Sequence, residues 1–295
     1  MAKKKSASIV ISDTHIMSTS GLCPEKIVLD DGSTHIPNKL QSLLNKWFSE
    51  FIEDAKRITW GHNRVLILNG DLGELDSKHR SSQIISTNAS TVIKTIIETI
   101  NPLVSFCDKV VVVRGTVAHT GKSSWVEEAI AHHYASKIIP QEEQVYSHYH
   151  FKSEIDGIRY DVAHHARMGG MRHTAKGYAQ RLALDTMDKY RDRGQEPPHI
   201  VLRSHNHRRA DSGYNWPTYV SMLPSWQFPT EFIYRIGAEN DPVHIGGDIF
   251  FNHTDIPPRV IKDVQKYSVH DGFTHIPLDY PKYIEPEAWS ELSFT

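Results

Sequence analysis

Two residues near the N-terminus have side chains that could bind one metal ion. Asp13 and His15 follow the apolar run 9–11 and are two positions apart. Side chains at i and i+2 of an extended chain point to the same side, so both would meet at the end of a strand. A carboxylate oxygen with an imidazole nitrogen suits zinc, iron or manganese better than calcium, which prefers oxygen ligands alone.

Similar side chains follow four further apolar runs. They are Asp71 after residues 65–68, His119 after 110–113, His164 and His165 after 158–163, and His205 and His207 after 200–202. In α/β sheets, ligands bind beyond the carboxyl ends of strands. Five successive strand ends that carry Asp or His therefore predict one shared metal site. Of the adjacent pair we favour His164, because it comes first after its strand.

The elements that must position these residues can be read from apolar periodicity. Helical spacing is found over 39–58, 87–106, 124–136 and 175–193, with Ser123 or Ser124 as the expected N-cap of the third helix. Strands are expected over 7–12, 65–68, 110–113, 158–163, 200–202, 218–222 and 232–236. Alternation of strands and helices, followed by strands alone, indicates an α/β layered fold.

Composition narrows the classes of protein and partner. The chain has 295 residues, of which 39% are hydrophobic and 23% charged, which is typical of a soluble globular protein. No run approaches the ~18 apolar residues of a membrane span, so we expect no membrane partner. A net charge of -2 gives no global reason for nucleic-acid binding, and two cysteines argue for a reducing compartment. Nineteen histidines fit metal chemistry.

Taken in order, the motifs resemble those of the calcineurin-like metallophosphoesterases. They are Asp13-Thr-His15, Gly70-Asp71-x-x-Glu74, a Gly115 loop with His119, His164, and His205-Asn-His207, and they span about two-thirds of the chain. The segment with Gly21-Leu-Cys-Pro24 and Leu29-Asp-Asp-Gly32 is further similar to uncharacterised bacteriophage phosphoesterases. We expect a cytoplasmic protein, in the host cytoplasm if it comes from a phage.

This resemblance implies a four-layer fold, with two central β-sheets flanked by helices, and a dinuclear metal centre. It assigns Asp13, His15 and His207 to one ion, His164 and His205 to the other, and Asp71 to both as a bridge. The two divalent ions would be manganese, with iron or zinc as alternatives. They would generate a hydroxide that attacks phosphorus in line with the leaving oxygen. We expect a catalytic domain over residues 1–240 and a C-terminal extension over 241–295 packed on it.

The loop after residue 113 departs from the family pattern. The family usually has Gly-Asn-His followed by an acid, with the Asn on the second ion and the His protonating the leaving group. Here Thr116 takes the Asn position and His119 comes two residues late. Thr116 could offer its hydroxyl or leave the position to water. His119 could be the general acid or the missing ligand, and we favour the acid. A milder departure is Ser204, where the family commonly has Gly.

The candidate substrate-binding residues are Thr116, Arg114 and Arg167. Arg114 could clamp a phosphate bidentately or form a structural ion pair. Arg167 opens a basic stretch that could hold the flanking phosphates of a nucleic acid, although a solvated helix face balanced by aspartates explains the same charges. Tyr214, Trp216, Tyr219 and Trp226 could stack bases or belong to the core.

The sequence therefore predicts a metal-dependent phosphoesterase that hydrolyses phosphodiester bonds, with a nuclease acting on nucleic acid as a candidate. A phosphomonoesterase acting on proteins or small molecules is the main alternative. A binding protein that keeps the fold without turnover is the other alternative, because the third motif is altered. The sequence sets no oligomeric state.

Overall fold

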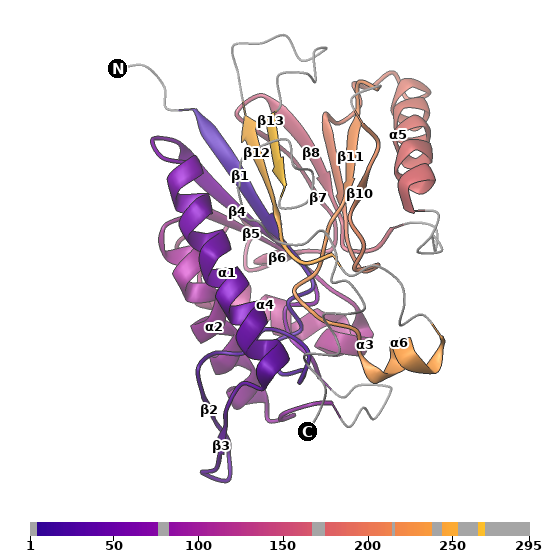
Figure 1. Ribbon diagram of the computed structural model, residues 1–295. Coiled ribbons are helices and arrows are strands. Elements are labelled where there is room, and N and C mark those ends of the chain that lie inside the picture. The colour runs from indigo at the N-terminus through magenta and orange to yellow at the C-terminus, as the bar shows by residue number, and fades with distance from the viewer. Residues whose placement is uncertain are drawn as a thin grey trace.

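Two β-sheets form the centre of the molecule, and helices cover both outer sides (Figure 1). The computed structural model describes residues 5–75, 83–166, 175–213, 216–237, 244–252 and 265–268. The first sheet contains, in spatial order, β13 (Gln265–Ser268), β12 (Asp248–Asn252), β1 (Ser6–Ile11), β4 (Asn63–Asn69), β5 (Lys109–Val113) and β6 (Ser147–His148). The second contains β10 (Ala210–Asp211), β11 (Tyr219–Met222), β9 (Ile200–Arg203), β8 (Ile158–Val162) and β7 (Phe151–Ile155).

The helices divide between the two sheets. On the outer face of the first sheet lie α1 (Lys39–Ile58), α2 (Ala89–Ser105) and α4 (Trp125–His133), and on that of the second lies α5 (Ala175–Arg191). The short elements α3 (Val117–Thr120), η1 (Lys122–Ser124), α6 (Glu231–Arg235) and the hairpin β2 (Ile27–Val28) with β3 (Thr34–His35) belong to the connections. None of the helices in the described ranges has the length and apolar character needed to cross a bilayer.

Strand alternation produces three separate cores. Along β1, Ile9 and Ile11 pack with the apolar faces of α1, α2 and α4, whereas Val10 points to the other side. There it packs with residues of the second sheet such as Tyr160 and Leu202. A third cluster joins the opposite face of the second sheet to α5. The structure thus confirms the predicted four layers of helix, sheet, sheet and helix.

The predicted elements recur in the structure with two corrections. The strand expected over residues 232–236 is wrong, since α6 occupies this run. Only Ile233 of it is buried, and Gly237, at φ 67, ends the helix as glycines commonly do. Ser124 does stand at the N-cap of α4, but it makes no capping bond there and instead donates its hydroxyl to the Gly115 carbonyl, at 2.9 Å.

Strands β12 and β13 were not predicted. They extend the first sheet, with β12 antiparallel to β1 and β13 antiparallel to β12. Both belong to the expected C-terminal extension, most of which lies outside the described residues. The domain boundary at residue 240 stays a prediction.

A buried polar link joins the two sheets. The Tyr160 hydroxyl on β8 donates to Asn252 Oδ1 on β12, at 2.6 Å. The Asn252 amide in turn donates to Ser6 Oγ at 3.1 Å and Ser8 Oγ at 3.0 Å, both on β1. All four residues are buried. Because the partners have no access to water, the Tyr160 bond constrains how the two sheets pack, and the two serine bonds fix the Asn252 side chain within the first sheet.

We predict that Tyr160→Phe lowers the free energy of unfolding by about 1–3 kcal/mol, because it removes the donor to Asn252 Oδ1 inside the core. Urea denaturation measures this change. Tyr234→Phe makes the same chemical change on a tyrosine that is 51% exposed, and its effect should stay within about 0.5 kcal/mol. Equal effects of the two substitutions would contradict the structural role of the link.

Candidate metal centre

The candidate site lies where the carboxyl ends of strands from both sheets meet. Strands β1, β4 and β5 are parallel neighbours, so the loops after them leave the first sheet at one edge. Strands β8 and β9 are parallel in the second sheet and bring His164 and His205 to the same place. The first two loops are joined by Asp13 N–H to Gly70 O at 3.0 Å and His15 N–H to Asp71 O at 3.1 Å.

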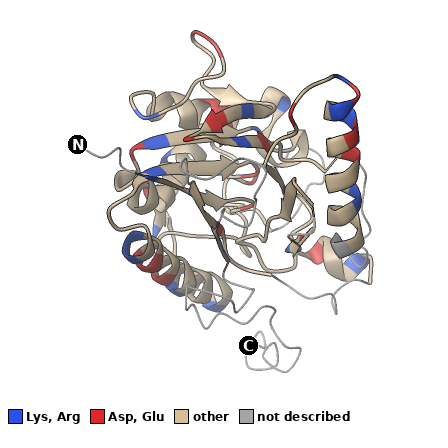
Figure 2. Cartoon of the chain, turned by 90° about the horizontal axis from the view of Figure 1, so that it is seen from above, with Lys and Arg blue, Asp and Glu red and all other residues tan. Residues whose placement is uncertain are grey.

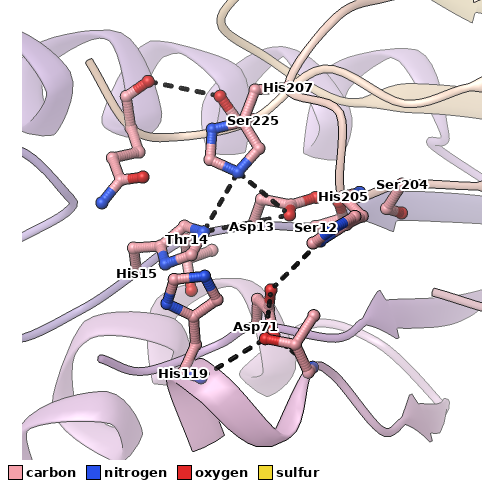
Figure 3. Close-up of polar contacts among 12 residues, drawn as sticks. Ser12, Asp13, Thr14, His15, Asp71, His119, Ser204, His205, His207 and Ser225 are labelled. Carbon is pink, nitrogen blue, oxygen red and sulfur yellow. Dashed lines mark hydrogen bonds and ion pairs between the residues drawn. The ribbon is translucent and has the colours of Figure 1, made fainter. Parts of the chain in front are cut away.

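The six predicted ligands form two groups. The ligand atoms of Asp13, His15 and His207 lie within 4.8 Å of one another, and so do those of Asp71, His164 and His205. In Figure 3 the labelled side chains of both groups converge on one space. These are the same two sets that the family resemblance assigns to two ions, with His164 rather than the exposed His165 as a member.

The ligand atoms of the first group lie close to one another. The Nε2 atoms of His15 and His207 are 3.1 Å apart, and His207 Nε2 lies 3.3 Å from Asp13 Oδ1. In the second group, His164 Nε2 lies 3.0 Å from Asp71 Oδ2, and His205 Nδ1 lies 4.0 Å from the same oxygen. Since a carbonyl oxygen only accepts, the 2.7 Å contact from His164 Nδ1 to Asn69 O makes Nδ1 the protonated nitrogen and leaves Nε2 as the donor atom for a metal.

The backbone is strained at most of these positions. Asp13, His15, Asp71, His205 and His207 all have positive φ, between 41° and 74°. Residues other than glycine rarely adopt this conformation, and such outliers cluster at functional sites. Asp13 and His15 adopt the left-handed conformation after their strand, so the extended geometry expected for them from the sequence is wrong, although their side chains still lie in one group.

Two carboxylates are completely buried in this centre. Asp13 Oδ1 accepts no well-formed hydrogen bond, and it lies 3.3 Å from His207 Nε2 and 3.8 to 3.9 Å from the Nε2 atoms of His164 and His15. Burial works to raise the pKa of Asp13, but His164 and His207 outweigh it and hold that pKa well below its usual range. His164 does the same for the pKa of Asp71.

This donor set fits a divalent transition-metal ion. A buried carboxylate oxygen without a hydrogen bond is costly, and a cation beside that oxygen would compensate its charge. Carboxylate oxygens together with imidazole nitrogens are the ligands that zinc, iron and manganese sites share. The orphaned Asp13 Oδ1 among three imidazoles is therefore the observation that favours metal binding.

Thr116 and Gly115 position the Asp71 carboxylate. The Thr116 backbone N–H donates to Asp71 Oδ1 at 2.5 Å, and the Thr116 hydroxyl lies 3.1 Å from the same atom. A side chain at Gly115 would have its Cβ only 2.1 Å from Asp71 Oδ1. Thr116 itself is 6% exposed. The structure thus places Thr116, predicted among the substrate-binding residues, in direct contact with the proposed bridge.

No role was predicted for Glu74 from the sequence, although it contacts two histidines of the site. Its carboxylate accepts from His15 Nδ1 and from His119 Nδ1, each at 2.7 Å. Burial works to lower the pKa of His119, but this bond and the charge of Glu74 raise it to about 9. Glu74 belongs to the motif Gly70-Asp71-x-x-Glu74, but the sequence does not indicate which histidines donate to its carboxylate.

The position of His119 can be compared with its two predicted roles, general acid and metal ligand. Its ring packs edge-on against His15, with the ring centroids 4.6 Å apart, and it groups with His15 and Glu74. It is not a member of the Asp71, His164 and His205 group, where a missing ligand would be needed. Because Nδ1 is bonded to Glu74, any further partner of the ring would have to bind at Nε2.

The other predicted substrate contacts have different outcomes. Arg114 forms the structural ion pair, with Glu128 at 3.3 Å, and also donates to Ser147 Oγ at 2.8 Å. Arg167 lies outside the described residues. Tyr219 and Trp226 are buried, in agreement with the alternative that they belong to the core. Opposite charges alternate along α5 (Figure 2), where Lys189 pairs with Asp185 at 3.8 Å.

Comparison with known proteins gives remote similarities. No family model and no curated protein matches the chain. A solved archaeal phosphodiesterase is 13% identical, covering 88% of this chain and 98% of its own, with a TM-score of 0.36. Vps29 from Entamoeba histolytica complexed with zinc is 13% identical, covering 83% and 84%, with a TM-score of 0.36. A hypothetical protein from Pyrococcus horikoshii is 9% identical, covering 97% and 92%, with a TM-score of 0.41. At this distance the function has to be inferred from the side chains of the site.

We predict that Gly115→Ala weakens Mn²⁺ binding on the order of 10- to 100-fold, because the new Cβ would lie 2.1 Å from Asp71 Oδ1 and 2.2 Å from the Asp71 backbone nitrogen and so has to displace the whole residue. Isothermal titration calorimetry of the metal-free protein measures this. Gly177→Ala is the matched control, since a Cβ there meets nothing within 4 Å. Unchanged Mn²⁺ affinity in Gly115→Ala would show that the position of Asp71 does not govern binding.

Proposed function

We propose that this protein is a metal-dependent phosphoesterase that hydrolyses phosphodiester bonds. The observation that carries the proposal is the pair of ligand groups around the buried Asp13 and Asp71 carboxylates. When bound, two divalent cations would hold the phosphoryl oxygens and lower the pKa of a water molecule that attacks phosphorus. Manganese is the ion we expect, with iron or zinc as alternatives.

In this proposal the residues of the chain have distinct tasks. Asp13, His15 and His207 would hold one ion, His164 and His205 would hold the other, and Asp71 would serve both. His119 donates a proton from Nε2 to the leaving oxygen, while Glu74 fixes its ring through Nδ1. In this role His119 would supply the proton that the leaving alkoxide needs as it develops charge.

Charge favours a diester over a monoester. A monoester carries about two negative charges near neutral pH and a diester one. Arg114, next to the third motif, is paired with Glu128 and bonded to Ser147. It is therefore not the cation that would neutralise the second negative charge of a monoester. A nucleic acid is a candidate diester. Arg208, directly after His207, is only partly buried, and its positive charge could contact a backbone phosphate beside the site. A phosphomonoesterase is the competing assignment.

The proposed activity predicts Mn²⁺-dependent hydrolysis of bis-p-nitrophenyl phosphate. Asp71→Asn should lower kcat/KM at least on the order of a hundredfold, because it weakens the shared ligand of both ions. Asp185→Asn makes the same change in a half-exposed carboxylate of α5 and should leave the rate unaltered. We also expect bis-p-nitrophenyl phosphate to be turned over faster than p-nitrophenyl phosphate. Faster monoester turnover would contradict the preference, and no metal-dependent turnover of either would leave the inactive binding protein as the explanation.

The role of His119 predicts an effect that depends on the leaving group. His119→Ala should slow cleavage of the dinucleotide thymidylyl-thymidine on the order of 10² to 10⁴-fold, because an alkoxide has to be protonated as it leaves. Cleavage of bis-p-nitrophenyl phosphate should change much less, because nitrophenolate leaves without a proton. Metal content, measured by plasma mass spectrometry, should stay as in the wild type and in the exposed control His133→Ala. Loss of an ion in His119→Ala would make this histidine a ligand instead.

A further inference from the structure

We propose that Arg209 is a positioning residue, which holds the loop that carries His205 and His207 against the first sheet through Asp248. This inference rests on the proposed function, because that loop supplies one ligand to each of the two groups. It gives a task to a charged side chain that lies two positions beyond His207 and belongs to neither ligand group.

Arg209 lies between two carboxylates inside the protein. Its side chain is 9% exposed, and its Nη1 atom donates to Asp211 Oδ2 at 3.0 Å. Its Nε atom lies 3.7 Å from Asp248 Oδ1, and Asp248 is 0% exposed. A charge withdrawn from water in this way depends on opposite charges beside it, and removing the guanidinium would leave a buried carboxylate uncompensated. The side chain is therefore anchored inside the protein.

Asp248 belongs to the first sheet and contacts the second. It is the first residue of β12 and lies opposite Val10 of β1, three positions before Asp13. The Ser221 hydroxyl on β11 donates to Asp248 Oδ2 at 2.7 Å. A Cβ at the neighbouring Gly247 would lie 2.5 Å from the Val10 carbonyl oxygen, so the chain packs closely against β1 here. Asp248 thus has a fixed place relative to the strand that leads to Asp13.

The loop from residue 204 to residue 209 is held at both ends. At its start, the His205 backbone N–H donates to Asp13 Oδ2 at 3.3 Å. At its end, Arg209 connects it to Asp248. Between these contacts, His205 and His207 have φ of 74° and 52°, an unfavourable conformation that the surrounding structure has to support. A shift of Arg209 would therefore displace His207, whose Nε2 lies 3.3 Å from Asp13 Oδ1.

The test is a calorimetric titration of Mn²⁺ into the metal-free full-length protein and its Arg209→Gln variant, with circular dichroism as the measure of folding. We expect Arg209→Gln to bind Mn²⁺ on the order of 10- to 100-fold more weakly, as substitutions behind metal ligands commonly do. Unchanged affinity in this variant would overturn the inference and leave the proposed function intact. No Mn²⁺ binding by the wild-type protein would overturn both.

A second arginine separates positioning from a general loss of stability. Arg64 donates to Thr59 Oγ1 at 2.7 Å and to the Lys56 carbonyl oxygen at 3.2 Å, at the opposite end of β4 from the site. Arg64→Gln should lower the midpoint of urea denaturation and leave Mn²⁺ affinity unaltered. Equal losses of affinity in Arg64→Gln and Arg209→Gln would contradict the assignment.

Two further variants test the contact with Asp248 itself, and they replace Arg209→Gln if that variant does not fold. Arg209→Lys keeps a positive charge between the two aspartates and should retain more of the Mn²⁺ affinity than Arg209→Gln. Asp248→Asn should weaken Mn²⁺ binding, and adding it to Arg209→Gln should weaken binding little further, because both changes break the same contact. Wild-type affinity in Asp248→Asn, additive losses in the double variant, or a loss in Arg209→Lys as large as in Arg209→Gln would contradict the proposal.

Discussion

The charge of Asp13 and Asp71 is the constraint on which the rest of the site depends. Both carboxylates are completely buried where two sheets meet, and one oxygen of Asp13 has no hydrogen-bond partner. Buried anions persist in proteins only when other groups compensate their charge. Here histidines from three loops surround them, and Thr116 donates twice to Asp71. The site can therefore hold additional positive charge, and this is the basis of the proposal that divalent cations bind there.

This constraint also explains why the site needs both sheets. Asp13, His15 and Asp71 follow strands of the first sheet, whereas His164, His205 and His207 follow strands of the second. Neither sheet has a complete ligand group, so the packing of the two inner faces sets the distances between ligands. Five of these six residues have positive φ, an unfavourable conformation that the surrounding structure has to support. The core between the sheets has to be rigid for the ions to sit at fixed positions.

Apolar periodicity predicted an α/β layered fold and the strand ends that carry Asp or His, because both are local information, whereas the four layers and the division into two ligand groups came from the family resemblance. The periodicity placed α1 at Lys39–Ile58 and β1, β4, β5, β8 and β9 within about two residues. The partners of Glu74 could not be predicted, because His15 and His119 are 59 and 45 residues away in the chain. The same limit applies to Arg114, whose pairing with Glu128 depends on where α4 packs. The short apolar run at α6 fits a strand and a helix equally well, and its packing decided between them.

The account requires two ions that share Asp71, and this can be observed without any substrate. Electron paramagnetic resonance of the Mn²⁺-saturated protein reports directly whether neighbouring ions are coupled through a bridging ligand. We predict the spectrum of an exchange-coupled Mn²⁺ pair in the wild type, replaced in Asp71→Asn by the spectrum of isolated Mn²⁺. A spectrum of isolated Mn²⁺ alone in the saturated wild-type protein would contradict a dinuclear centre bridged by Asp71.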